Sequence, residues 1–240
     1  MRLAVHIQTM KELRAQGPGD EPDPVTVAAM LDIAGADGIV YRLQDPSDER
    51  ERNDLHLLKT MVRSHLNLEI EPNDDQLRLA LETKPDQVTI VPPSKISYDF
   101  GLNVDEEAEE LERMAGTLQA GGINVSVLIS PDITQVKEAR RIRVDYVTIN
   151  TVPYTSSKTA EEALMNLEEI QTVALGAERL GLRVLVARGL SYRNIGPLAG
   201  LPSVEEAILG RSLFNRAVFI GLERAMNEVR GAVHGREPQP

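Results

Sequence analysis

Cysteine and tryptophan are absent from the sequence, and aromatic residues make up only 3% of its 240 residues. Without cysteine there is no disulfide, no thiolate metal site and no cysteine nucleophile. With so few aromatic rings, the core must be built from Leu, Ile, Val, Ala and Met. No apolar run approaches the roughly 18 residues that span a bilayer, and residues 1–10 are too short and too polar for a signal peptide. We therefore expect a cytoplasmic protein with no membrane partner.

Positive charge is also scarce, because 26 Lys and Arg stand against 37 Asp and Glu for a net charge of −11. The negative electrostatic field of such a protein repels nucleic acid and anionic lipid, so we expect neither as a partner. An anionic ligand would need a local cluster of Arg or Lys. The chain has no Walker-type loop, no GxGxxG motif and no His, Asp and Glu at metal-ligand spacing. We therefore predict no metal and no bound cofactor.

What the sequence does contain is an alternation of short Val-, Ile- and Leu-rich runs with longer stretches of helical periodicity. The predicted strands are residues 3–7, 38–43, 66–70, 87–91, 124–129, 146–150, 183–187 and 206–209. The predicted helices are residues 24–33, 51–64, 74–82, 105–120, 131–140, 159–180, 191–198 and 212–229. These repeats predict a single α/β domain, a (β/α)8 TIM barrel over residues 1–232, with a disordered tail at 233–240. An open doubly wound sheet is the alternative.

Local capping residues support these helix boundaries. Asp23 and Asn73 precede predicted helices and can accept hydrogen bonds from the first N–H groups. Gly35, Gly121-Gly122, Gly181 and Gly200 follow predicted helices, where a left-handed residue can end the helix.

Polar side chains stand at the carboxyl ends of most predicted strands, and in a barrel these ends meet in one mouth. The residues concerned are His6, Gln8, Arg42, Gln44, Glu69, Glu71, Asn150, Thr151, Arg188 and Arg211. Carboxylates that face three arginines indicate an anion site with Glu69 as a possible general base. We predict Glu69, Arg42 and Arg188 as catalytic residues, and His6, Gln8 and Gln44 as ligand-binding residues.

The turns after the last two predicted strands have the composition of a phosphate site. Arg188-Gly189 and Gly210-Arg211 place a glycine and an arginine where backbone N–H groups at helix starts bind phosphate in this fold. Gly189, Gly210 and Arg211 are therefore predicted to bind a phosphorylated or otherwise anionic small molecule. Residues 44–50 and 92–103 follow strand ends and are candidates for loops that cover a ligand.

Each of these assignments has a simpler alternative. Arg42 and Glu69, on adjacent strands, can form a structural ion pair, and Arg211 can be an exposed residue at a helix start. Glu71 can be a solvated carboxylate, and His6 a core histidine with its hydrogen bonds satisfied.

At these same positions the chain resembles the pyridoxine 5′-phosphate synthase (PdxJ) family over nearly its whole length. The phrases that carry the resemblance are Pro22-Asp23-Pro24-Val25, Ala34-Gly35-Ala36-Asp37-Gly38-Ile39, Leu66-Asn67-Leu68-Glu69, Glu82-Thr83-Lys84-Pro85, Ala120-Gly121-Gly122-Ile123-Asn124-Val125-Ser126, Arg188-Gly189-Leu190-Ser191-Tyr192-Arg193-Asn194 and Gly210-Arg211-Ser212. The resemblance implies an octameric barrel that condenses 1-deoxy-D-xylulose 5-phosphate with 3-amino-2-oxopropyl phosphate. It also implies that Glu69 matches the catalytic glutamate, and Gly189 and Gly210 the phosphate-binding glycines.

The chain departs from that family at every expected active-site histidine. The family's first strand reads Asn-x-Asp-His, and here the same positions are His6-Ile7-Gln8-Thr9. The histidines expected after strands 2, 7 and 8 are Arg42, Arg188 and Arg211, and the arginine that follows the first of them is Gln44. Because arginine stays charged, these changes exchange proton-transfer groups for anion-binding ones. Three hypotheses follow: a synthase with altered acids and bases, a diverged paralogue acting on another phosphorylated or carboxylated molecule, or a non-catalytic ligand-binding protein.

Overall fold

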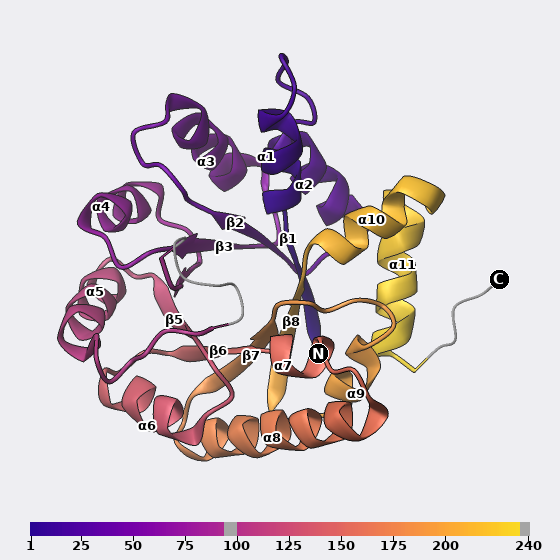
Figure 1. The fold of residues 1–240 in the computed structure, drawn as a ribbon. Coiled ribbons are helices and arrows are strands. Elements are labelled where there is room, and N and C mark those ends of the chain that lie inside the picture. Colours follow the sequence, from indigo (N-terminus) through magenta and orange to yellow (C-terminus); the bar gives the residue numbers. More distant parts are fainter. Residues whose placement is uncertain (94–99, 236–240) are drawn as a thin grey trace.

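In the computed structural model, which describes residues 1–93 and 100–235, eight parallel strands close into a barrel (Figure 1). Each strand pairs with the next, and β8 pairs with β1, so the sheet has no free edge. This confirms the predicted (β/α)8 barrel over the open sheet. The strands are β1 Arg2–His6, β2 Gly38–Arg42, β3 His65–Ile70, β4 Gln87–Ile90, β5 Asn124–Ile129, β6 Tyr146–Asn150, β7 Arg183–Ala187 and β8 Val204–Leu209.

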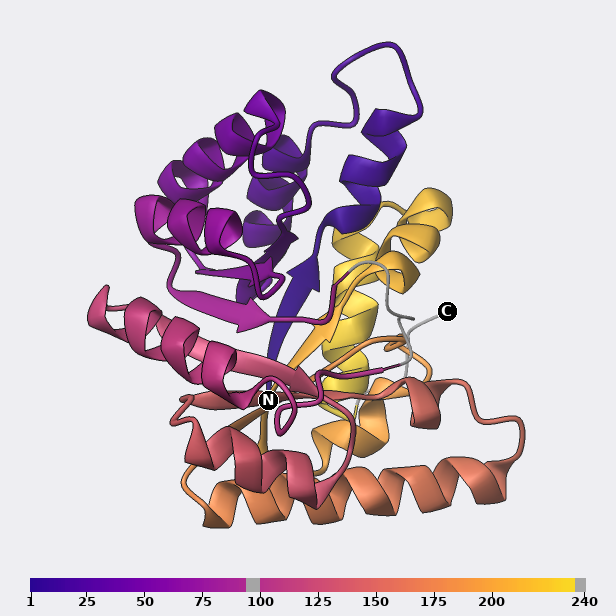
Figure 2. The same cartoon turned by 60° about the vertical axis from the view of Figure 1, so that its left-hand side comes forward.

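Helices surround the strands, as both Figure 1 and Figure 2 show. They are α1 Gln8–Ala15, α2 Pro24–Ile33, α3 Glu49–Met61, α4 Asp74–Thr83, α5 Ala108–Ala120, α6 Ile133–Arg141, α7 Val152–Thr155, α8 Ala160–Arg179, α9 Ile195–Ala199, α10 Arg211–Ile220 and α11 Leu222–Val233. None of the helices in the described residues is long and apolar enough to cross a membrane. Of the two predicted ligand-covering loops, the second includes residues 94–99, which lie outside the described residues, as do residues 236–240 of the predicted tail.

Three helical features differ from the sequence-based prediction. Helices α1 and α7 were not predicted, because α7 is one turn long and only Met10 and Lys11 of α1 are buried, so neither has an apolar periodicity. The predicted helix 212–229 is two helices, since Gly221 between them adopts φ +84°. The predicted helix 191–198 is shorter and begins at Ile195.

The predicted N-terminal helix caps are confirmed. The Asp23 carboxylate accepts hydrogen bonds from the N–H groups of Val25 and Thr26, and Asn73 caps α4 in the same way. Gly35, Gly122 and Gly181 have φ between +79° and +87°, the left-handed conformation in which residues other than glycine are strained. For Gly121 and Gly200 the expectation of a left-handed residue is wrong, because both have right-handed helical φ values of −77° and −76°.

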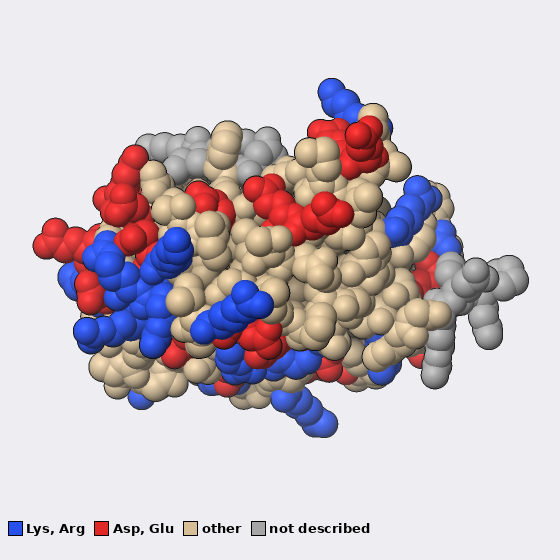
Figure 3. Space-filling model, turned by 90° about the horizontal axis from the view of Figure 1, so that it is seen from below, with Lys and Arg blue, Asp and Glu red and all other residues tan. Residues whose placement is uncertain are grey.

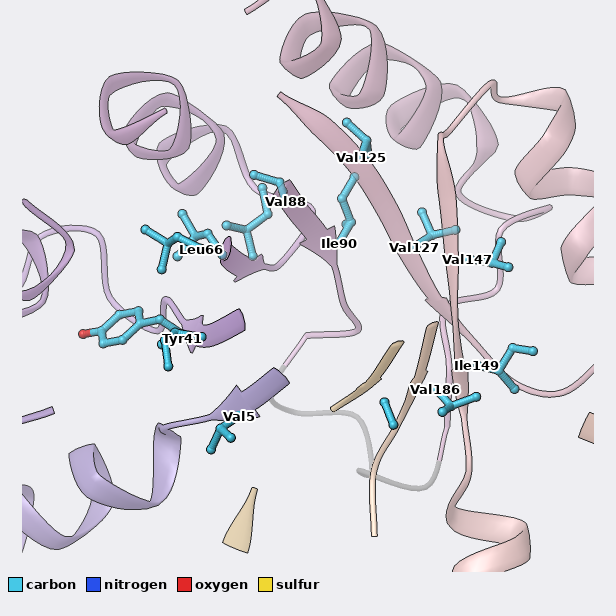
Figure 4. Close-up of a cluster of buried hydrophobic side chains, with 14 of the residues drawn as sticks. Val5, Tyr41, Leu66, Val88, Ile90, Val125, Val127, Val147, Ile149 and Val186 are labelled. Carbon is cyan, nitrogen blue, oxygen red and sulfur yellow. The ribbon is translucent and has the colours of Figure 1, made fainter. Parts of the chain in front are cut away.

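The hydrophobic core lies mainly between the strands and the helices rather than inside the barrel. Outward-facing strand residues such as Val5, Leu66 and Val147 are buried under the helices (Figure 4). Each such side chain contributes about 1.5–3 kcal/mol on burial. The opposite faces of the strands carry many buried polar residues: Asn67, Glu69, Gln87, Thr89, Ser126, Thr148, Asn150 and Glu206. The barrel interior is therefore rich in polar groups, and the apolar residues there include a small cluster of Ala4, Val40, Ala187 and Ile208.

Candidate functional site

A cavity of about 760 Å³ opens at the carboxyl ends of the strands. All nine residues predicted to be catalytic or ligand-binding line it: His6, Gln8, Arg42, Gln44, Glu69, Arg188, Gly189, Gly210 and Arg211. The residues that line it do not include Glu71, Asn150 and Thr151, which the sequence also placed at the strand ends. Thr9, Glu12 and Asn215 also line it and were not predicted, because they lie on α1 and α10 rather than at strand ends. Recognising a helix directly after β1 would have added the first two.

Glu69 is the buried charge at the base of this cavity. Its Oε2 atom lies 3.1 Å from His6 Nε2 and 3.2 Å from Arg188 Nη2, and its side chain is 2% exposed. Burial alone would raise the pKa of Glu69, but the positive charge of Arg188, then His6 and Arg42, outweighs it and holds the pKa well below its usual range. Glu69 is therefore ionised at neutral pH and is held in place by His6 at the end of β1 and Arg188 in the turn after β7.

Arg42 makes its ion pair with a different carboxylate. Although Arg42 and Glu69 are register partners on β2 and β3, Arg42 Nη2 lies 3.3 Å from Glu71 Oε1 and donates to the Pro92 carbonyl at 2.9 Å. Glu71 is thus half-buried and paired rather than solvated. The guanidinium is held beside the cavity, where it still lowers the proton affinity of Glu69.

A buried network behind β2 fixes the segment that carries Arg42 and Gln44. Lys11 Nζ donates to the Arg42 carbonyl at 2.7 Å and lies 2.9 Å from Glu51, whose carboxylate accepts the Gln44 N–H at 2.9 Å. No local pattern signals this Lys11–Glu51 pair, because the two residues belong to helices that meet only when the barrel closes.

The turn after β7 adopts an unusual backbone conformation. Arg188 has φ +85° and Gly189 has φ +70°, and the Thr151 hydroxyl donates to the Arg188 carbonyl. A non-glycine residue in this conformation is strained and is held there by its surroundings. The turn brings the Arg188 guanidinium to Glu69 and leaves the Gly189 backbone at the cavity wall.

Replacing Gly189 by alanine should destabilise the protein. A Cβ atom at this position would overlap the Thr155 hydroxyl, and φ is in the left-handed region, so Gly189→Ala should cost about 1–3 kcal/mol of unfolding free energy. Denaturant unfolding measures this cost. Gly200→Ala, whose added Cβ would make only ordinary contact, is the matched control. Equal stability of the two variants would contradict the expectation.

Arg211 lies at the rim of the cavity rather than at its centre. It is the first residue of α10, its side chain is 72% exposed, and its Nη2 lies 3.3 Å from Glu12 Oε2. The arrangement matches the alternative of an exposed residue at a helix start, although the residue lines the cavity. Gly210 precedes it, beside His6 on the neighbouring strand.

Fold and site together define a β/α-barrel protein with a charged, ligand-sized cavity at the carboxyl ends of its strands. The family model for the pyridoxal phosphate biosynthesis protein PdxJ matches residues 3–235. A pyridoxine 5′-phosphate synthase from Synechococcus sp. (strain JA-2-3B'a(2-13)) is 38% identical over 235 residues, covering 97% of this chain and 98% of the relative. A pyridoxine 5′-phosphate synthase from Citrifermentans bemidjiense is 37% identical over 230 residues, covering 95% and 96%. The chain belongs to the PdxJ family.

A solved structure shares the fold at low sequence identity. The Amycolatopsis orientalis BexX/CysO complex matches with a TM-score of 0.63 and 16% identity, covering 98% of this chain and 88% of that chain. At this identity the likeness concerns the barrel alone.

Proposed function

We propose that this chain binds small phosphorylated molecules in the cavity and carries out the ring-closing condensation of its family. The substrates would be 1-deoxy-D-xylulose 5-phosphate and 3-amino-2-oxopropyl phosphate, and the product pyridoxine 5′-phosphate. The observation that carries this proposal is the buried, ionised Glu69 held between His6 and Arg188 in a cavity large enough for such ligands.

Each predicted site residue has a role in this proposal. Glu69 supplies the fixed negative charge that meets the amino group of a substrate, and the Arg42 and Arg188 guanidinium groups stabilise negative charge that develops on a carbonyl oxygen. The backbone at Gly189 and Gly210, together with Arg211, binds phosphate at the start of α10. Gln8 and Gln44 offer hydrogen bonds to hydroxyl groups.

The test is direct assay of the purified protein with the two substrates, together with rescue of a pyridoxine auxotroph. We expect pyridoxine 5′-phosphate to form, and Glu69→Gln to lower kcat by roughly 100-fold or more, because the fixed charge is lost. Glu71→Gln, which changes the neighbouring carboxylate that pairs with Arg42, should have a smaller effect. The proposal fails if the wild-type protein makes no product and supports no growth.

A second candidate is a related reaction on another phosphorylated or carboxylated molecule. It is favoured by one observation, that three guanidinium groups line a cavity in which the family pattern has histidines. A rise in Tm with inorganic phosphate, without product from the two family substrates, would favour this candidate. If neither a rise in Tm nor product is observed, the non-catalytic role remains.

We also propose that the chain forms a homo-oligomer. Large apolar side chains are more than four-fifths exposed at Ile33, Val218 and Phe219, and others such as Met165 lie on α8. Figure 3 views the side of the molecule on which α8 lies in Figure 1, where a broad uncharged surface lies between charged groups at the edges. Light scattering measures the size of the assembly. The resemblance to the family implies an octamer.

A further inference from the structure

His6 lines the cavity, and the groups around its imidazole ring are those expected around a proton-transferring residue. We propose that His6 is the proton-transferring residue of this site and that Glu69 is its fixed anionic partner. This inference rests on the proposed function and assigns its acid–base step to β1. Among the described residues that line the cavity, His6 is the single imidazole, the side chain suited to exchange protons near neutral pH.

The hydrogen bonds of His6 define which ring nitrogen carries the proton. The backbone N–H of Gln8 donates to His6 Nδ1 at 3.2 Å, and because an N–H group can only donate, Nδ1 must present its lone pair. The proton of the neutral ring is then on Nε2, which donates to Glu69 Oε2 at 3.1 Å. A carboxylate on one ring nitrogen and a lone pair on the other is the arrangement of a general base.

Glu69 is poorly suited to take the proton itself. The charge of Arg188 that keeps it ionised also makes it a weak base, and the same oxygen atom accepts from both His6 and Arg188. A fixed carboxylate instead stabilises the imidazolium that forms when His6 gains a proton. The low proton affinity of Glu69 therefore supports a counterion role and leaves proton transfer to its neighbour.

The other charged groups around His6 fit the same assignment. Arg188 comes from the end of β7 and Arg42 from the end of β2, while Arg211 and Glu12 lie at the rim on α10 and α1. The guanidinium groups stay protonated, so they cannot exchange protons near neutral pH, but they can stabilise an enolate oxygen.

The proposed step removes a proton from a carbon next to the ketone of 1-deoxy-D-xylulose 5-phosphate. The C–H bond breaks, the proton goes to His6 Nδ1 in place of the Gln8 N–H contact, and the electron pair forms the enolate C=C bond. The negative charge on the enolate oxygen then faces Arg188 and Arg42. The imidazolium later returns the proton to a departing hydroxyl group, which leaves as water.

Solvent deuterium exchange into 1-deoxy-D-xylulose 5-phosphate alone, followed by NMR, tests this step without the second substrate. We expect the wild-type protein to exchange the proton, and His6→Asn and His6→Gln to slow the exchange by about 100-fold or more with a similar Kd for the phosphosugar. His56→Asn, on the exposed surface of α3, is the control and should exchange at the wild-type rate. Circular dichroism melting establishes that each variant is folded.

The pH profile separates a proton-transferring residue from a structural one. The wild-type exchange rate should fall as pH is lowered, because a base that is already protonated cannot accept the substrate proton. The residual rate of His6→Asn should lack this dependence, whereas Glu69→Gln should be slower than wild type but keep it. The inference is overturned if either folded His6 variant exchanges the proton at the wild-type rate. It is also overturned if the pH dependence is lost in Glu69→Gln but kept in His6→Asn.

The outcomes also distinguish this inference from the proposed function. Exchange that depends on His6, without formation of pyridoxine 5′-phosphate from both substrates, supports the inference and refutes the family reaction. Product formation that is unaffected in His6→Asn refutes the inference alone. Absence of exchange and of product in the wild-type protein refutes both.

Discussion

Glu206→Gln should stabilise the protein above neutral pH by on the order of 3 kcal/mol. Glu206 lies on β8 inside the barrel and is fully buried, and neither of its carboxylate oxygens has a hydrogen-bond partner among the described residues. Arg2 Nη2 is 3.3 Å away but is 41% exposed, so the pair is only partly shielded from water. Burial raises the pKa of Glu206 from 4.5 to about 7, although Arg2 opposes this rise.

The sign of the effect follows from proton linkage. The folded state binds the Glu206 proton more tightly than the unfolded state, so ionisation costs stability. The cost is absent below about pH 4.5, grows as pH rises, and is complete above about pH 7. A rise in pKa of this size corresponds to on the order of 3 kcal/mol, which glutamine avoids because it does not ionise.

Denaturant unfolding from pH 4 to pH 8 measures this difference. The gap between wild type and Glu206→Gln should widen across the range. Glu205→Gln is the matched control, because Glu205 is the next residue, partly exposed and paired with Arg183, so its replacement should change stability by less than about 1 kcal/mol. A constant gap from pH 4 to pH 8 would show that Glu206 does not ionise with a raised pKa.

Lys11→Met should destabilise the protein by about 3–5 kcal/mol, because it leaves the Glu51 carboxylate buried without its cation. The side chains of Lys11 and Glu51 are 6% and 8% exposed, and Lys11 Nζ also lies 4.3 Å from the centre of the Tyr41 ring. Burial lowers the pKa of Lys11, and the Glu51 and Asp54 carboxylates offset this only in part. The expected fall in Tm is roughly 10 °C.

A double-mutant cycle separates two effects of Lys11→Met: the buried Glu51 carboxylate left without a cation, and the loss of packing around Lys11. Lys11→Met combined with Glu51→Gln should regain most of the lost stability, because glutamine is neutral and can still accept the Gln44 N–H. Lys59→Met, which removes an exposed pair with Asp86, is the control and should cost less than about 1 kcal/mol. If Lys11→Met loses no more stability than Lys59→Met, the Lys11–Glu51 pair does not have the stabilising role given to it here.

The strands and most helices could be predicted because their signals are local. The run at residues 66–70 alternates outward leucine or isoleucine with Asn67 and Glu69, and the structure buries both faces. Asp23 and Asn73 bind the helix ends next to them in the chain. Helix α1 lacked such a signal, because its inward face carries Lys11, a residue whose partner is on α3.

The sequence by itself determined the barrel and the residues at its mouth, since strand periodicity and strand ends are properties of neighbouring residues. Only the tertiary structure decided the pairing of charges: Arg42 with Glu71, Arg188 with Glu69, and His6 turned so that Nε2 faces the carboxylate. Pairing depends on distances across the closed barrel and on the turn after β7, where Arg188 takes a left-handed conformation. Those distances are set by all eight strands together, so no segment of the chain encodes them alone.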